Sequence, residues 1–200
     1  MMMKRWSKAA SILCLLAMVL LLFAACGEAK PADDTEEPAN YEETETTDEE
    51  STLETYQLTL YYPSYAYMVD GTGDELLPYS CELMAEPEDI YIEVARALSS
   101  VPEGEDETVY QTAFYDGLSI HDVYEKDGIL YVDVASEGLN GGSTEESLLI
   151  EQIVESYLHS FADAIKAVQF LVDGSPAETL MGQWDISEPF GHLIDAAAEQ

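Results

Sequence analysis

The chain has 200 residues, of which 41 are acidic and only 7 are basic, so its formal net charge at pH 7 is −34. So acidic a chain repels phosphate groups, which argues against nucleic acids and anionic lipid headgroups as partners. Hydrophobic residues make up 47% of the chain, enough to build a packed core in one domain.

The first 25 residues have the layout of a secretory signal peptide. Basic residues at the start precede an almost wholly apolar stretch, 9–25. The stretch ends in Phe-Ala-Ala-Cys, which resembles a bacterial lipobox, with Phe23 where Leu is usual. An uncleaved membrane helix is the alternative, but a stretch of this length is at the short limit for crossing a bilayer.

Cys26 is therefore expected to carry a diacylglycerol, whose two acyl chains would hold the protein stably on a membrane. The predicted location is the outer face of the cell membrane. Cys14 would be removed with the signal peptide, so no internal disulfide is expected. Cys81 is interpreted as a small buried residue and not as a reactive thiol.

Residues 27–54 are predicted to be a disordered tether. Acidic residues dominate this segment and apolar residues are nearly absent, so it cannot bury enough surface to offset its chain entropy. Like charges would extend it between the lipid and a folded domain. The alternative is an acidic segment that binds a partner.

Residues 55–200 have a globular composition and are predicted to form one domain. Apolar and polar residues alternate over Tyr56–Pro63, which is typical of a strand. Tyr65–Val69 is expected to continue as an edge segment. Leu76–Met84 is predicted to be a second extended piece, and Pro78 places it at the edge of a sheet.

The middle of the domain is predicted to hold a helix and a hairpin. Pro87 suits the first position of a helix, and apolar residues follow at helical spacing as far as Leu98. A strand around Leu118–Val123 is expected next. Asp127–Gly128 favours a hairpin turn into a further strand, Leu130–Val134.

A second helix is predicted after Gly141–Gly142, with Ser143 and Glu146 forming a capping box. Ile153 and Leu158 lie on its apolar stripe and are expected in the core. A buried strand from Ala167 to Val172 follows, and the chain after it, as far as Phe190, is expected to fold back over the core. A short closing helix is expected around Ala196–Ala198.

The order β-α-β-β-α-β predicts an α+β domain with a small mixed β-sheet and two main helices on one face.

Several segments resemble the sporulation and spore germination domain, GerMN. The strand that ends in Val172–Asp173–Gly174, the Glu-Thr-Leu step that follows, and the close Asp185–Pro189 resemble the end of that domain. Upstream, three segments resemble its first strand, central strand and second helix: Tyr56–Pro63, Gly128–Val134 and Glu145–Phe161. The resemblance covers about residues 55–190.

The resemblance implies a fold like the ring-building domains of secretion assemblies and a non-enzymatic, protein-binding role at the cell surface. Some members of the family act in spore formation and germination, in envelope complexes between mother cell and forespore. The best-known members carry tandem pairs of the domain, whereas this chain shows one. An envelope protein is therefore the expected partner, besides the membrane.

No catalytic residues, metal site or cofactor are predicted from the sequence. The three histidines, His121, His159 and His192, are scattered along the chain without a partner at metal-ligand spacing. Asp70, Asp74 and Glu75 lack the spacing of a calcium-binding EF-hand. Ser143 has neither a nucleophile-elbow motif nor a paired histidine, which argues against a hydrolase.

Four aromatic residues are candidates for a recognition surface: Tyr61, Tyr65, Tyr67 and Trp184. For Trp184 the simpler interpretation is packing beneath the closing segment. A deep pocket lined by all four would favour the alternative function, a surface lipoprotein that binds a small ligand or cell-wall glycan. A shallow surface with exposed strand edges would favour binding of a protein.

Overall fold

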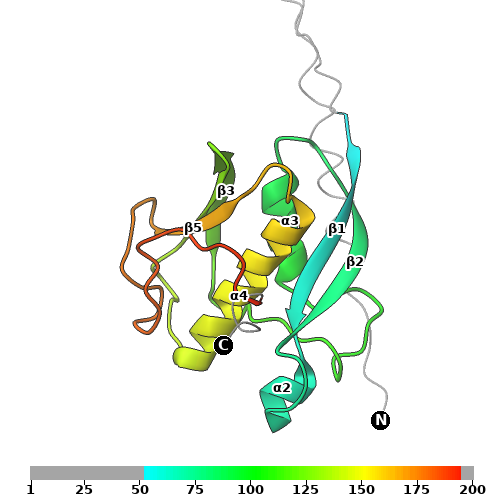
Figure 1. Cartoon of the computed structure of the whole chain (residues 1–200), viewed down its shortest axis with the longest axis vertical. Coiled ribbons are helices and arrows are strands. Elements are labelled where there is room, and N and C mark those ends of the chain that lie inside the picture. Colours follow the sequence, from blue (N-terminus) through cyan, green and yellow to red (C-terminus); the bar gives the residue numbers. More distant parts are fainter. Residues whose placement is uncertain (1–51, 195–200) are drawn as a thin grey trace, which may run out of the picture. The chain divides into compact units, whose positions relative to one another are not determined.

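The computed structural model describes residues 52–194, which fall within one compact unit (Figure 1). The expectations for the signal peptide, for Cys26, for the tether as far as residue 51 and for a closing helix at Ala196–Ala198 lie outside these residues. Within residues 52–194, no helix combines the length and the apolar composition that crossing a membrane requires.

The described residues form five strands and three helices, an α+β domain as predicted. In chain order they are β1 (Glu54–Pro63), α2 (Tyr65–Asp70), β2 (Leu76–Ala85), α3 (Ile90–Leu98), β3 (Ile120–Lys126), β4 (Ile129–Val134), α4 (Ser143–Ser160) and β5 (Ala167–Val172).

The strands form two small sheets, where a single mixed sheet was expected. β1 and β2 pair antiparallel, with Glu54 opposite Ala85 and Pro63 opposite Leu76. In the second sheet, β4 lies between antiparallel β3 and parallel β5.

Two serines of α4 explain why the sheets stay separate. The backbone N–H of Tyr61 donates to Ser156 Oγ at 2.8 Å, and that of Thr59 donates to Ser160 Oγ at 3.1 Å. Ser160 Oγ in turn donates to the carbonyl of Thr59 at 3.0 Å. Backbone groups on the free edge of β1 are thus satisfied by a helix, so this edge cannot pair with a strand of the second sheet.

Helix α4 lies between the two sheets and contacts both β1 and β5, while α3 contacts β2 and β3 (Figure 1). Eleven of the 18 residues of α4 are buried, which makes it a central helix and not one that covers a single face. Ile153 is 1% exposed and Leu158 is 2% exposed, so both are core residues as predicted.

The segment expected to continue β1 as an edge is instead the short helix α2. Ser64 caps its start by accepting a hydrogen bond from Tyr67 N at 3.4 Å. Gly71 ends it in the left-handed conformation, with φ of 65°, which glycine adopts without strain. The predicted hairpin turn is confirmed, because Asp127 and Gly128 both have positive φ, 56° and 84°, as a type I′ turn requires.

The glutamate whose side chain caps the start of α4 is Glu145, whereas Glu146 was predicted for this role. Gly142 occupies the position before the helix, and its N–H donates to Glu145 Oε2 at 3.1 Å. The helix therefore begins one residue earlier than the capping-box pattern implied. This shift turns Glu146 away from solvent, and its side chain is fully buried.

The Glu146 carboxylate binds the chain that follows β5. Its two oxygens accept hydrogen bonds from the backbone N–H groups of Leu180, Met181 and Gln183, at 3.0, 2.9 and 2.8 Å. Farther on, Ile186 is fully buried. Phe190 forms an antiparallel bridge with Val168 of β5. The prediction that this segment folds back over the core is confirmed.

Replacing Glu146 with Ala is expected to lower the free energy of unfolding by about 3 kcal/mol or more. Three backbone donors would lose their acceptor, and each buried unsatisfied donor costs about 1–3 kcal/mol. Urea unfolding of the full chain measures the effect. Glu145→Ala, next along the helix, is the control, because it removes one exposed capping bond and should cost no more than about 1 kcal/mol. Equal losses for the two variants would contradict the anchoring role of Glu146.

Candidate functional site

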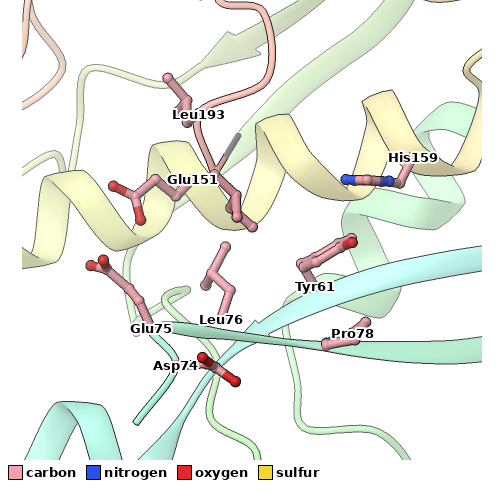
Figure 2. A pocket seen from close by; sticks show the side chains of 9 residues that line it. Tyr61, Asp74, Glu75, Leu76, Pro78, Glu151, His159 and Leu193 are labelled. Carbon is pink, nitrogen blue, oxygen red and sulfur yellow. The ribbon is translucent and has the colours of Figure 1, made fainter. Parts of the chain in front are cut away.

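A pocket of about 420 Å³ lies beside α4, between β1–β2 and the end of the described chain (Figure 2). Its walls come from the β1–β2 ladder and the start of β2, from α4, and from Leu193 and Ile194. The lining residues are Tyr61, Asp74, Glu75, Leu76, Pro78, Glu151, His159, Leu193 and Ile194.

Two carboxyl groups meet at one end of this pocket. Figure 2 shows Glu151, on α4, facing Glu75, which comes just before β2. The pKa of Glu151 is raised from its usual 4.5 to about 7, mainly by burial and in part by the neighbouring Glu75 and Glu155 carboxylates, against a hydrogen bond from Ser147 Oγ at 2.8 Å that lowers it. Glu75 also contacts the hydroxyl of Tyr67 and raises its pKa. Glu151 is therefore expected to carry a proton for part of the time near neutral pH.

The other end of the pocket is lined by His159, and His192 lies beside this histidine. His159 Nε2 lies 3.3 Å from Glu155 Oε2, and His192 Nδ1 lies 2.9 Å from the same oxygen. The interpretation of these histidines as scattered is wrong, because the closing segment brings His192 onto α4. Glu155 and His159 are neighbours on one helix face, a spacing that the sequence shows. His192 lies beside Glu155 only because of the tertiary fold, so the sequence pattern does not reveal this contact.

His121 lies apart from this cluster. Its Nδ1 is 3.8 Å from Asp133 Oδ2, and it lines a second hollow of about 270 Å³ together with Arg96 and Phe114. The ring of Tyr61, by contrast, lies 4.7 Å from the ring of His159, centroid to centroid.

The four aromatic candidates occupy different places. Tyr61 lines the pocket, and Tyr67 lies close to it through its contact with Glu75. Tyr65 is 38% exposed on α2. Trp184 is partly buried against the core and does not line this pocket, in agreement with packing beneath the closing segment. The structure thus does not join the four into one recognition pocket.

A second surface feature escaped the sequence analysis. Four exposed apolar side chains form what we term the α2 patch: Tyr65, Met68, Val69 and Val109, which are 38%, 46%, 59% and 44% exposed. The first three lie on one face of α2. The N–H of Tyr65 donates to the carbonyl of Val109 at 3.0 Å, which places the fourth beside them. The spacing of Tyr65, Met68 and Val69 is typical of one helix face and could have revealed the patch, but the segment was interpreted as extended.

Comparison with known proteins gives the family. The family model described as "Germane: Sporulation and spore germination" matches residues 59–178. The chain belongs to the Germane family. No curated protein sequence matches it.

Solved structures support the fold. The first GerMN domain of the sporulation protein GerM from Bacillus subtilis superposes with a TM-score of 0.52 at 15% identity, over 68% of this chain and 96% of that domain. The tandem GerMN domains of the same protein match at 16% identity with a TM-score of 0.45, over 70% of this chain and 46% of theirs. A candidate lipoprotein from Clostridium perfringens matches at 23% identity with a TM-score of 0.45, over 68% of this chain and 87% of that one. The superposition on the first GerMN domain, together with the family match, gives the Germane domain of this chain the GerMN fold.

The raised pKa of Glu151 predicts a stability that falls as pH rises. The folded chain binds this proton more tightly than the unfolded chain, so the free energy of unfolding decreases between pH 4.5 and about 7. The expected loss is on the order of 1 kcal/mol, because solvent screens this half-buried group.

Urea unfolding of the unmodified chain and of Glu151→Gln, at several pH values across this range, measures the difference between them. The difference removes the contribution of the many other carboxylates. Glu137→Gln, at an exposed position, should follow the unmodified chain. Parallel pH profiles for the unmodified chain and Glu151→Gln would show that Glu151 titrates normally.

Proposed function

We propose that this Germane-family protein is a lipoprotein on the outer face of the cell membrane whose domain binds another envelope protein without catalysing a reaction. Assembly of a sporulation or germination complex is the process it would serve. The α2 patch is the observation that carries this proposal.

Helix α2 contributes nothing to the core, since none of its residues is buried. A helix of six residues is too short to be stable by itself, yet α2 is capped at both ends by Ser64 and Gly71. Apolar side chains held together on such an exposed helix are typical of a surface that a protein partner covers. Figure 1 shows α2 at one end of the domain, below the tip of β1, where a partner could reach it.

The charge around the patch defines the partner further. The exposed carboxylate of Asp70 lies at the end of α2, and those of Asp106 and Glu107 shortly precede Val109 in the chain. The fitting partner therefore has an apolar contact surface with basic residues at its rim. Such a rim would speed association at low salt and would weaken as salt screens it.

The edge of β2 offers a second contact. Among the described residues, β2 pairs with β1 and with no other strand, so a strand of the partner could add to its free edge. Pro78 lacks an N–H group and limits such pairing to part of the strand. The α2 patch is therefore the primary contact in this proposal.

The ligand-binding alternative has less support. It requires one pocket lined by the four aromatic candidates, whereas the pocket beside α4 includes Tyr61 alone of the four and three carboxylates. Glycan-binding sites depend on aromatic rings that present flat faces to the sugar, and this pocket lacks a set of them.

A photo-crosslinking residue placed at Met68 in the full chain, expressed in its own host, is expected to form an adduct with one envelope protein. The control position is Tyr124, which is 39% exposed on β3 and lies outside both the patch and β2. The second change Val69→Asp should lower the yield of the Met68 adduct about tenfold, because it places a charge in the apolar contact.

Mass spectrometry of the purified adducts identifies the partner. Equal adducts at Met68 and Tyr124, or an adduct that Val69→Asp leaves unchanged, would remove the patch from the proposal. Specific retention of cell-wall glycan by the purified full chain, without a protein adduct, would favour the ligand-binding alternative.

Cys26→Ala is expected to remove the lipid from the protein and, where the leader is still cleaved, to release the protein from the membrane fraction. The reason is that diacylglycerol attachment requires the thiol of Cys26. Fractionation of a Gram-positive host and intact mass of the unmodified protein, with Cys81→Ala as the control, measure both effects. A membrane-bound Cys26→Ala variant, with no lipid mass on the unmodified protein, would contradict anchoring through Cys26.

A further inference from the structure

We propose that Glu155, His159 and His192 form a binding site for a transition-metal ion, with Zn²⁺ as the ion that fits best. One of the three residues, His159, also lines the pocket beside α4, and none of them belongs to the α2 patch.

The ligand atoms already lie at the spacing that a metal ion needs. Glu155 Oε2 is 3.3 Å from His159 Nε2 and 2.9 Å from His192 Nδ1, and one donor atom from each residue falls within 4.8 Å of the others. Donors bound to Zn²⁺ at about 2.0–2.2 Å are separated by about 3.3 Å in tetrahedral geometry. A metal ion could therefore replace the present hydrogen bond after small side-chain movements.

The carboxylate is oriented for this role by the backbone. Glu155 Oε1 accepts hydrogen bonds from the N–H groups of Leu193 and Ile194, the latter at 3.0 Å. Oε2 is thereby left facing the two imidazoles. Hydrogen bonds of this kind, which fix a ligating group from behind, are a regular feature of metal sites in proteins. Glu155 is fully buried, so its orientation does not vary as that of a surface carboxylate would.

The two imidazoles remain accessible while the carboxylate does not. The side chain of His159 is 37% exposed and that of His192 is 38% exposed. An ion could enter from solvent between the rings and bind the buried oxygen beneath them. Three protein ligands would leave a fourth position for water or for a group of a bound partner.

The donor set selects the kind of ion. Imidazole nitrogen favours Zn²⁺ and its neighbours in the transition series, whereas Ca²⁺ and Mg²⁺ favour oxygen ligands. This distinction matters in a chain with 41 acidic residues, because its surface carboxylates will attract any divalent cation weakly. Saturable binding of Zn²⁺ in the presence of excess Mg²⁺ therefore distinguishes the proposed site from weak binding of divalent cations to the surface carboxylates.

Binding of Zn²⁺ would also hold the closing segment against α4. His159 and Glu155 belong to the helix, and His192 belongs to the segment after Phe190, so the ion would join two parts of the chain. The unfolded chain does not hold these three groups together, and binding would therefore raise the midpoint of unfolding.

Isothermal calorimetry of the metal-free full chain in detergent, titrated with Zn²⁺ in millimolar Mg²⁺, tests the site. One saturable site is expected. His159→Ala and His192→Ala should each weaken binding at least tenfold, since even residues that only orient a metal ligand are worth about 10–100-fold. His121→Ala removes a histidine outside the cluster and should leave affinity unchanged. Absence of a saturable site, or equal affinity in all three variants, would overturn the proposal.

If a variant fails to fold, the visible spectrum of the unmodified chain with Co²⁺ tests the metal site without it. A strong absorption band of tetrahedral Co²⁺ supports the site. The weak spectrum of octahedral, oxygen-bound Co²⁺ would show that the ion binds only surface carboxylates, and would overturn the site. Circular dichroism of each variant establishes whether it is folded.

Discussion

The fold depends on two buried carboxylates of one helix that bind the backbone of the chain after β5. Glu146, in the first turn of α4, accepts three N–H groups from residues 180–183, and Glu155, two and a half turns on, accepts two from residues 193–194. Burying a charge is costly unless hydrogen bonds satisfy it, and both glutamates are satisfied. Among the described residues, no buried side-chain nitrogen or oxygen lacks a partner. The closing segment has little regular structure of its own, so these bonds provide much of what orders it.

The same helix also uses other polar residues to end a sheet. Ser156 and Ser160 satisfy backbone groups on the edge of β1, and Gln152 accepts the N–H of Ala113 at 2.7 Å. A helix in the middle of a domain is ordinarily apolar on all sides. Here its polar residues act as hydrogen-bonding partners for segments that cannot complete their own ladders. This explains why α4 combines a buried position with glutamate, glutamine and serine side chains.

The elements with regular periodicity were predictable, and the features fixed by tertiary contacts were not. Alternation over Tyr56–Pro63, the Asp127–Gly128 turn and the apolar stripe through Ile153 and Leu158 each agree with the structure, because each reflects a local rule. The split into two sheets was missed, since nothing in β1 shows that serines of a distant helix occupy its edge. Glu146 was assigned to a capping box for a similar reason: its sequence position fits a cap, and only the path of residues 180–183 shows that it faces inward. The pairing of His192 with Glu155 depends on that same path.

These contacts also determine which surfaces remain for function. Since α4 covers one edge of β1 and the closing segment covers α4, the free edge of β2 and the exposed face of α2 are left at the side of the domain away from β5. Neither is needed for folding, because α2 buries no residue. Exposed apolar side chains that lie together, as Met68 and Val69 do on α2, are typical of binding surfaces, whereas single ones are common anywhere on a protein. The pocket lies against α4, and Leu193 and Ile194 of the closing segment form part of its wall. An ion bound by Glu155, His159 and His192 would therefore act on the closing segment.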